Sequence, residues 1–100
     1  MAVVAYGFTA RTSLYVVRRL RKEGMKIGMV RLKTLWPFPE DAMREVGQKV
    51  RKIVVPEMNR GQVAGEIRKA CLCDVFSIGQ TDGEVIPPEK IFDALRRLSR

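Results

Sequence analysis

The residues whose side chains are best suited to take part in chemistry are Glu57, Asn59 and Gln62, which fall within a six-residue stretch. They follow an apolar run, residues 53–56, whose length and composition predict a buried strand. In an α/β protein the carboxyl end of such a strand is where ligands and partners bind. A catalytic role would make Glu57 a general base, but the motif offers no second titratable group to share acid and base work. These residues therefore favour structural hydrogen bonds, or contact with a partner or cofactor, over catalysis.

Two glycines mark the turns that would hold this chemistry. Gly61 allows a positive φ or a close backbone approach, while Asn59 and Gln62 are expected to satisfy turn and helix-end amides. Gly7 ends the first apolar run, and Thr9 is a plausible N-cap for the next helix. A glycine turn before a helix resembles an anion site, so Gly7 and Thr9 are candidate anion contacts. One glycine is neither the dinucleotide fingerprint nor a Walker loop, and capping without a ligand is the favoured interpretation.

The cysteine and histidine content excludes several kinds of site. Cys71 and Cys73 are the only cysteines, and the chain has no histidine. Two thiolates are too few for a four-ligand zinc or iron–sulfur site. Their spacing is not the Cys-x-x-Cys of a redox pair, so packing as small buried side chains is favoured. Without histidine, Ser-His and Cys-His catalysis are excluded. We predict no catalytic residue and no metal site in this chain.

Trp36 and Phe38 carry the largest apolar area outside the expected helices and strands. Each precedes a proline, which holds it in an extended conformation. The two aromatic side chains either cover the end of the sheet or anchor a protein interface, where large aromatics concentrate binding energy. Both interpretations stay open, and both residues are interface candidates together with Glu57, Asn59, Gly61 and Gln62.

Length and charge restrict the class of protein. One hundred residues support a single domain, residues 1–100, with little room for a deep catalytic cavity. The formal charge of +8 suits an acidic partner, but the basic residues alternate with apolar ones along the expected helices. That pattern argues against nucleic acid. No apolar run is long enough to cross a bilayer, and no charged leader precedes the first apolar stretch, so a cytoplasmic location is expected.

Apolar periodicity predicts strands and helices in strict alternation. We expect a helix over residues 10–23, a second helix with Pro39 in its first turn and Ala42, Met43 and Val46 inward, and two more helices over 62–72 and from Pro88 onward. Strands are expected over residues 2–6, 26–32, 53–57 and 74–78. Crossovers of this length imply parallel strands and right-handed connections. A reversal after the second strand gives the sheet order 2-1-3-4, which places residues 7–10 beside residues 57–62.

Four motifs occur in order at suitable intervals: residues 4–7 (VAYG), 23–28 (EGMKIG), 34–40 (TLWPFPE) and 57–62 (EMNRGQ). Together they resemble the C-terminal domain of the alpha subunit of 2-oxoacid:ferredoxin oxidoreductases, most closely the 2-oxoglutarate type. The resemblance covers nearly the whole chain. It implies a transketolase C-terminal-like, three-layer α/β/α sandwich on a four-stranded, mainly parallel sheet.

The resemblance also implies a function. The complete enzyme of this family decarboxylates a 2-oxoacid on thiamine diphosphate, passes electrons through iron–sulfur clusters to ferredoxin, and forms an acyl-CoA. Other domains and subunits hold those cofactors, and this domain contributes mainly to subunit packing. We therefore expect a non-catalytic assembly domain that binds no cofactor by itself, is inactive alone, and reaches ferredoxin only indirectly. Whether the chain also self-associates stays open.

The chain departs from the family in length, because family alpha subunits are several times longer. An excised domain, a split gene product and a degraded remnant all stay open. Domains of this type carry a fifth, antiparallel strand beside the second, and without it residues 26–32 form an exposed edge. The alternative hypotheses are a free-standing module that binds nucleic acid through its basic surface, and one that binds a nucleotide or CoA through residues 7–10.

Overall fold

The computed structural model describes residues 1–33, 38–57, 61–79 and 86–99 of the chain. Strands and helices alternate along it, as the apolar periodicity predicts. The strands are β1 (Ala2–Tyr6), β2 (Gly28–Leu32), β3 (Lys52–Glu57) and β4 (Asp74–Gly79), and the helices are α1 (Gly7–Lys22), α2 (Glu40–Lys49), α3 (Gln62–Ala70) and α4 (Pro88–Leu98).

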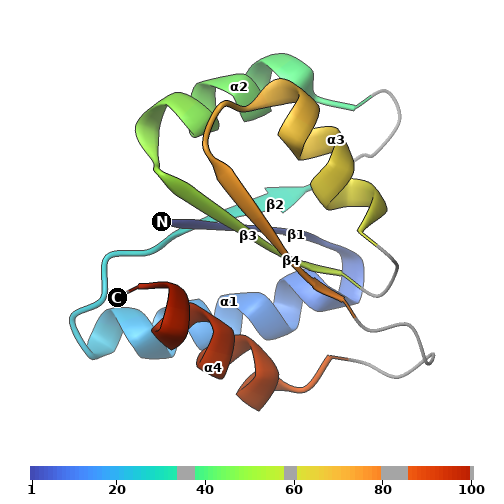
Figure 1. Ribbon diagram of the computed structural model, residues 1–100. Coiled ribbons are helices and arrows are strands. Elements are labelled where there is room, and N and C mark those ends of the chain that lie inside the picture. The colour runs from blue at the N-terminus through green and yellow to red at the C-terminus, as the bar shows by residue number, and fades with distance from the viewer. Residues whose placement is uncertain (34–37, 58–60, 80–85, 100) are drawn as a thin grey trace.

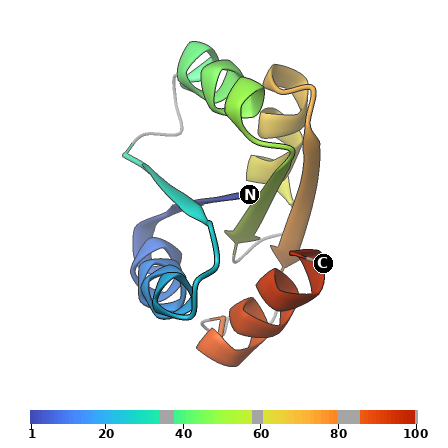
Figure 2. The ribbon, with the colours of Figure 1, turned by 90° about the vertical axis from the view of Figure 1, so that its left-hand side faces the viewer.

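The four strands form one parallel sheet with the order β2-β1-β3-β4, which confirms the predicted topology. Helices α2 and α3 cover one face, while α1 and α4 cover the other, so the molecule has three layers (Figure 1). The quarter turn in Figure 2 shows the same separation of the two helix pairs by the sheet. The winding reverses between β1 and β3, whose following helices α1 and α3 lie on opposite faces.

Each face of the sheet has its own apolar core, because successive side chains of a strand point to opposite faces. Val3 and Val54 belong to the core under α1 and α4, and their neighbours Val4 and Val55 belong to the core under α2 and α3. All four side chains are fully buried. The near-continuous apolar runs of β1 and β3 are therefore explained by burial on both faces, as is usual for central parallel strands.

Several local predictions were wrong. Helix α3 ends at Ala70 rather than at residue 72, and Pro39 is the N-cap of α2 rather than part of its first turn. Helix α1 begins at Gly7 rather than Ala10, with Tyr6 as its N-cap, so Thr9 lies inside the first turn and is not a cap. The glycine turns the chain from β1 straight into the helix at a φ of 60°, which removes the expected loop. Strand β2 is shorter than residues 26–32. Ala42 of α2 is exposed, because this helix faces the sheet along a narrower stripe that starts at Met43.

The two edges of the described sheet differ. At β4, the Arg68 guanidinium donates to the Val75 carbonyl oxygen at 3.0 Å, and the Lys90 ammonium donates to the Gly79 carbonyl oxygen at 2.8 Å. Basic side chains of α3 and α4 thus occupy edge groups that another strand would otherwise use. Strand β2 forms the opposite edge, with most of its residues half-buried or exposed, as expected for a sheet that ends at this strand.

Candidate functional site

The candidate site is the rim of the sheet where β1 and β3 end. These strands are parallel neighbours, with Ala2 opposite Ile53 and Val3 opposite Val54. Their carboxyl ends therefore meet at one edge, and α1 and α3 both start there, on the right-hand side of Figure 1. The prediction that both strands end at one rim is confirmed, and residues 58–60 of the second turn lie outside the described residues. We refer to residues 7–10 together with the described residues 57 and 61–62 as the switch-point rim.

Glu57 is the structural centre of this rim. Its side chain is fully buried, and its carboxylate accepts hydrogen bonds from the Val63 amide at 3.0 Å and the Ala64 amide at 3.1 Å. The Ser77 hydroxyl donates a third hydrogen bond to it at 3.1 Å. The carboxylate thus lies at the positive end of α3 and satisfies two amides that the helix leaves without an internal partner.

This network changes the interpretation of the three polar residues Glu57, Asn59 and Gln62. The sequence assigned the helix-end amides to Asn59 and Gln62, whereas Glu57 takes those of Val63 and Ala64. The buried carboxylate thus ties the first turn of α3 to β4 at the rim, a structural role that the hydrogen bonds show directly. Ser77 was missed by the sequence analysis because it lies 20 residues away on the neighbouring strand.

The other rim residues divide into three groups. Gly61 has a φ of 92°, as predicted, and a Cβ there would be 3.7 Å from the Ser77 hydroxyl. Gln62 is exposed as the first residue of α3, whereas Asn59 lies outside the described residues. Gly7 is exposed and Thr9 is buried at the start of α1, which has no side-chain cap and no acidic residue in its first turn. The anion contact by Gly7 and Thr9 stays a prediction.

The two aromatic candidates cannot be treated together. Phe38 is half-buried and packs against the core between the sheet and helices α2 and α3. This contact agrees with the interpretation in which the aromatic covers the sheet, and the part that is still exposed leaves the interface prediction standing. Trp36 lies outside the described residues.

The cysteines lie on the α2–α3 side of the sheet rather than at the rim. Cys71 is buried, as predicted, and its thiol donates to the Met43 carbonyl oxygen at 2.9 Å. Burial raises the pKa of the Cys71 thiol, and the neighbouring Cys73 raises that pKa further, while the Gly47 backbone and Arg44 lower it. Both cysteines are free of disulfide bonds. The raised pKa keeps Cys71 protonated and suits a packing role.

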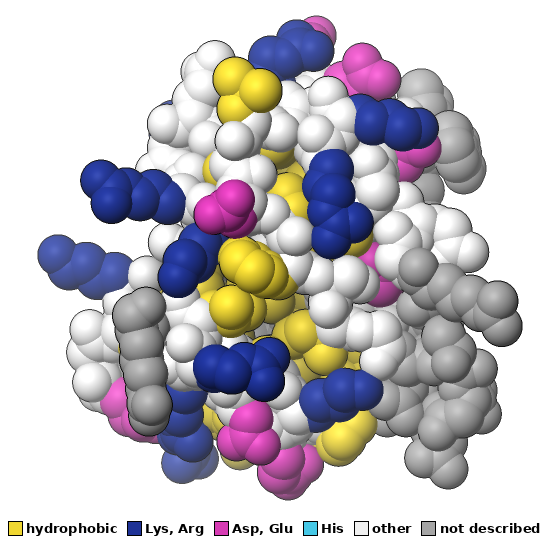
Figure 3. All heavy atoms as spheres, viewed as in Figure 1, with side chains coloured by type: hydrophobic (Ala, Val, Ile, Leu, Met, Phe, Trp, Pro, Cys, Tyr) yellow, Lys and Arg dark blue, Asp and Glu magenta, His cyan; other side chains and the backbone are white. Residues whose placement is uncertain are grey.

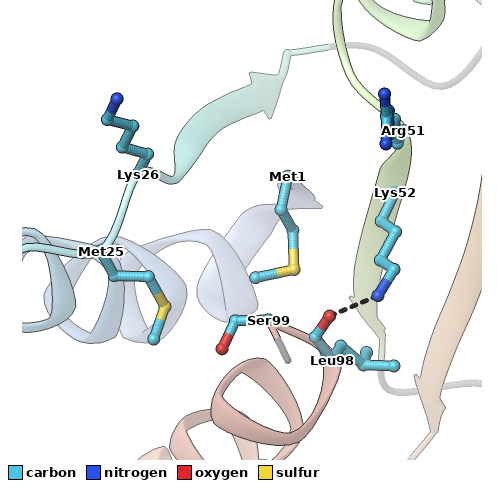
Figure 4. A pocket seen from close by; sticks show the side chains of 7 residues that line it. All are labelled: Met1, Met25, Lys26, Arg51, Lys52, Leu98 and Ser99. Carbon is cyan, nitrogen blue, oxygen red and sulfur yellow. Dashed lines mark hydrogen bonds between the residues drawn. The ribbon is translucent and has the colours of Figure 1, made fainter.

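A crevice of about 310 Å³ lies at the opposite rim, where β1 and β3 begin. It is lined by Met1, Met25, Lys26, Arg51, Lys52, Leu98 and Ser99. Figure 4 shows the Lys52 side chain reaching the end of α4, where its ammonium donates to the Leu98 carbonyl oxygen at 2.6 Å. A cation at a helix C-terminus is stabilising. Lys52 therefore joins β3 to α4, a long-range contact that periodicity does not reveal.

The described residues contain no group of three or more histidine, cysteine, aspartate or glutamate side chains that could hold a metal ion. The full chain supplies two cysteines and no histidine, which does not fit an iron–sulfur cluster. In Figure 3, Lys and Arg side chains are spread around an apolar strip and do not form one continuous tract on that face. Helices long and apolar enough for a membrane span are missing from the described part of the chain.

The sequence of residues 1–91 matches the family model described as pyruvate:ferredoxin oxidoreductase core domain II. The chain belongs to this family. Among its relatives, the 2-oxoglutarate synthase subunit KorA of Archaeoglobus fulgidus is 40% identical over 90 residues, which are 90% of this chain and 26% of the relative. The protein of the same name from Methanocaldococcus jannaschii is 39% identical over 90 residues, 88% of this chain and 24% of the relative. The chain thus spans about a quarter of the length of these relatives.

Solved structures agree with the family assignment. A 2-oxoglutarate:ferredoxin oxidoreductase from Magnetococcus marinus, solved with 2-oxoglutarate, coenzyme A and succinyl-CoA bound, superposes with a TM-score of 0.91 at 26% identity. The match covers 99% of this chain and 18% of that chain. A split-gene transketolase, solved as an inactive tetramer of four beta subunits, superposes with a TM-score of 0.78 at 19% identity over 96% of this chain. It supports the predicted transketolase C-terminal-like fold.

Proposed function

We propose that this chain is the assembly domain of a 2-oxoacid:ferredoxin oxidoreductase of the 2-oxoglutarate type, and that residues 1–100 form one domain. The observation that carries the proposal is the 40% identity to a 2-oxoglutarate synthase subunit over 90% of the chain. In this assignment the CoA-dependent oxidative decarboxylation belongs to the whole enzyme. The chain supplies one folded part of it.

The chemistry of the chain supports a role without catalysis. The buried carboxylate at the switch-point rim, Glu57, is committed to Val63, Ala64 and Ser77. An acid and base pair needs two titratable groups in different environments at one place, and the described rim presents only this one. Thiamine diphosphate and the iron–sulfur clusters implied by the family therefore belong to other domains or subunits, to which this chain contributes packing.

The switch-point rim is proposed to face those other parts. Ligands and partners of open α/β sheets bind outside the carboxyl ends of the strands, where the winding reverses. Here that region exposes Gly7 and Gln62, and it is held from below by the buried Glu57. Phe38, Trp36, Asn59 and Gly61 complete the set of proposed interface residues.

The proposal is tested by purifying the tagged chain from its own cells and identifying its partners by mass spectrometry. The retained polypeptides should carry the remaining domains of the oxidoreductase. The complex should reduce ferredoxin with 2-oxoglutarate and CoA, and the chain alone should not. Turnover by the chain alone would contradict the proposal, as would failure to associate with those polypeptides at micromolar concentration.

A matched pair of substitutions on α3 tests the rim. Gln62→Trp adds bulk at the proposed interface, and Lys69→Trp adds the same bulk to an exposed position seven residues further along the helix. We expect weaker association for the Gln62 variant and unchanged association for the Lys69 variant. Equal effects of the two substitutions on association would show that the switch-point rim is not part of the interface.

A further inference from the structure

Helix α1 carries an unusual outward face. Phe8 is 70% exposed and Tyr15 is 50% exposed, and they are two of the three large apolar side chains that stand exposed in the described part of the chain. They lie seven residues apart, which is close to two helical turns, so both can share one face. Between and beyond them a crevice of about 320 Å³ is lined by Arg11, Leu14, Tyr15, Arg18, Arg19 and Lys22. We call these residues together with Phe8 the α1 face.

The charge of the α1 face is not neutralised within the described residues. Helix α1 has five basic residues and no acidic residue. Arg21 donates to the Ile27 carbonyl oxygen at 2.7 Å, but Arg18, Arg19 and Lys22 form no ion pair with any described carboxylate. On α2 and α3 the situation is reversed, because Arg44, Lys49 and Lys69 are each paired with a carboxylate of their own helix.

Each aromatic side chain of the face contacts a neighbouring side chain. The Arg11 guanidinium lies 5.9 Å from the centre of the Phe8 ring, a cation–π distance. The Tyr15 ring meets Phe92 of α4 edge-on, with ring centres 6.2 Å apart. Exposed aromatics next to arginines have the composition of binding hot spots.

We propose that the α1 face docks an acidic protein surface of the oxidoreductase to which this chain belongs, with carboxylates opposite Arg11, Arg18, Arg19 and Lys22. This inference rests on the proposed function and names the surface and charge of the partner. The face starts at Phe8, which also belongs to the switch-point rim, so the two surfaces are continuous along one helix. A second copy of the chain is excluded as the occupant of a symmetric contact, because each cation would then meet a cation.

The test compares substitutions on the two helical layers, using the oxidoreductase polypeptides that co-purify with the chain as the probe. Arg11→Glu with Arg18→Glu reverses two charges on the α1 face, and Lys49→Glu with Lys69→Glu makes the same charge change on α2 and α3. Phe8→Ala is matched by Leu72→Ala, which removes the third exposed apolar side chain, on the opposite side of the sheet. All these side chains are exposed or half-exposed, and circular dichroism checks that each variant is folded.

We expect the double substitution Arg11→Glu with Arg18→Glu to weaken association at least about tenfold and to reduce the salt dependence of the affinity. Phe8→Ala should weaken it about 30-fold if the ring is a hot spot. The α2 and α3 controls and Leu72→Ala should leave affinity within about twofold. Equal losses from both charge pairs, or no loss from the α1 variants, would overturn the inference and leave the proposed function standing.

Two further outcomes distinguish failure of the proposed function from a nucleic-acid partner at the α1 face. If the unmodified chain forms no complex with those polypeptides, the proposed function itself fails. A single-stranded oligonucleotide that binds the α1 face more tightly than the polypeptides do, with a steep loss of affinity in salt, would overturn the assignment of a protein partner.

Discussion

The close approach of α2 to Cys71, the residue that follows α3, makes Gly47→Ala a sharp test of the structure. A Cβ at Gly47 would lie 2.8 Å from both the Cβ and the Sγ of Cys71, and 3.4 Å from its Cα. Cys71 has little freedom to move away, because it is buried and its thiol is bonded to the Met43 carbonyl oxygen at 2.9 Å. The new methyl group must therefore displace a helix or break that bond.

The expected change in the free energy of unfolding combines two costs and one gain. Overpacking a tight core costs about 1–3 kcal/mol, and losing the thiol hydrogen bond adds about 1 kcal/mol. Alanine is favoured over glycine in a helix interior by about 1 kcal/mol, which offsets part of the cost. Gly47→Ala should therefore lower the free energy of unfolding by about 1–3 kcal/mol, measured by urea denaturation followed by circular dichroism.

The chain offers a control with the same chemistry. Gly65 lies in α3, and a Cβ there meets nothing within 4 Å. Gly65→Ala should stabilise the protein by up to about 1 kcal/mol. Adding Cys71→Gly to Gly47→Ala removes both atoms at 2.8 Å, so the cost of Gly47→Ala should be smaller in that background. If Gly47→Ala stabilised the fold as much as Gly65→Ala does, the close approach of the helices would be refuted.

Three further predictions follow from individual contacts. Glu57→Gln should destabilise the fold by about 1.5–3 kcal/mol in urea titrations, because an amide cannot accept from every donor around it, whereas Glu45→Gln at an exposed position should change stability by less than about 0.5 kcal/mol. Burial raises the pKa of the Cys71 thiol above 9.0, so the folded state holds that proton more tightly than the unfolded state. The Cys71 thiol therefore contributes its full stabilisation below pH 9.0 and loses it as the pH rises through the pKa of the folded state. Between about pH 8 and about pH 10 the free energy of unfolding should fall more for the unmodified protein than for Cys71→Ala. Lys52→Met should cost about 1 kcal/mol in the same assay by removing the donor to the Leu98 carbonyl oxygen, and equal stability would show that this bond contributes nothing.

Much of the fold could be predicted because local pattern and global topology agree. The apolar runs of β1 and β3, and the helical periodicity between the strands, identify each element from its own residues. The order β2-β1-β3-β4 then follows from short right-handed crossovers and one reversal. Boundaries were less predictable, as at α1, where Gly7 enters the helix directly and Thr9 is consequently buried.

The roles within the site could be predicted only in part. Gly61 was identified as a positive-φ position because a single residue type fulfils that need. The role of Glu57 at the Val63 and Ala64 amides was not predicted, because several polar residues near a helix start can fill that role and local sequence does not rank them. The choice depends on β4, since Ser77 helps to fix the Glu57 carboxylate from across the sheet.

The α1 and α3 helices both start at the switch-point rim, but their ends are satisfied differently. At α3 the carboxylate of Glu57 fills the positive end from inside the domain, and Gly61 fixes the chain just before the helix. The residues on either side of 58–60 are thus positioned by contacts within this chain, without any partner. At α1 the helix has no side-chain cap, and further along it Arg18 and Arg19 form no ion pair with any described carboxylate. The start of α3 is thus fixed by a carboxylate of the same domain, whereas the α1 face presents cations to the acidic partner proposed above.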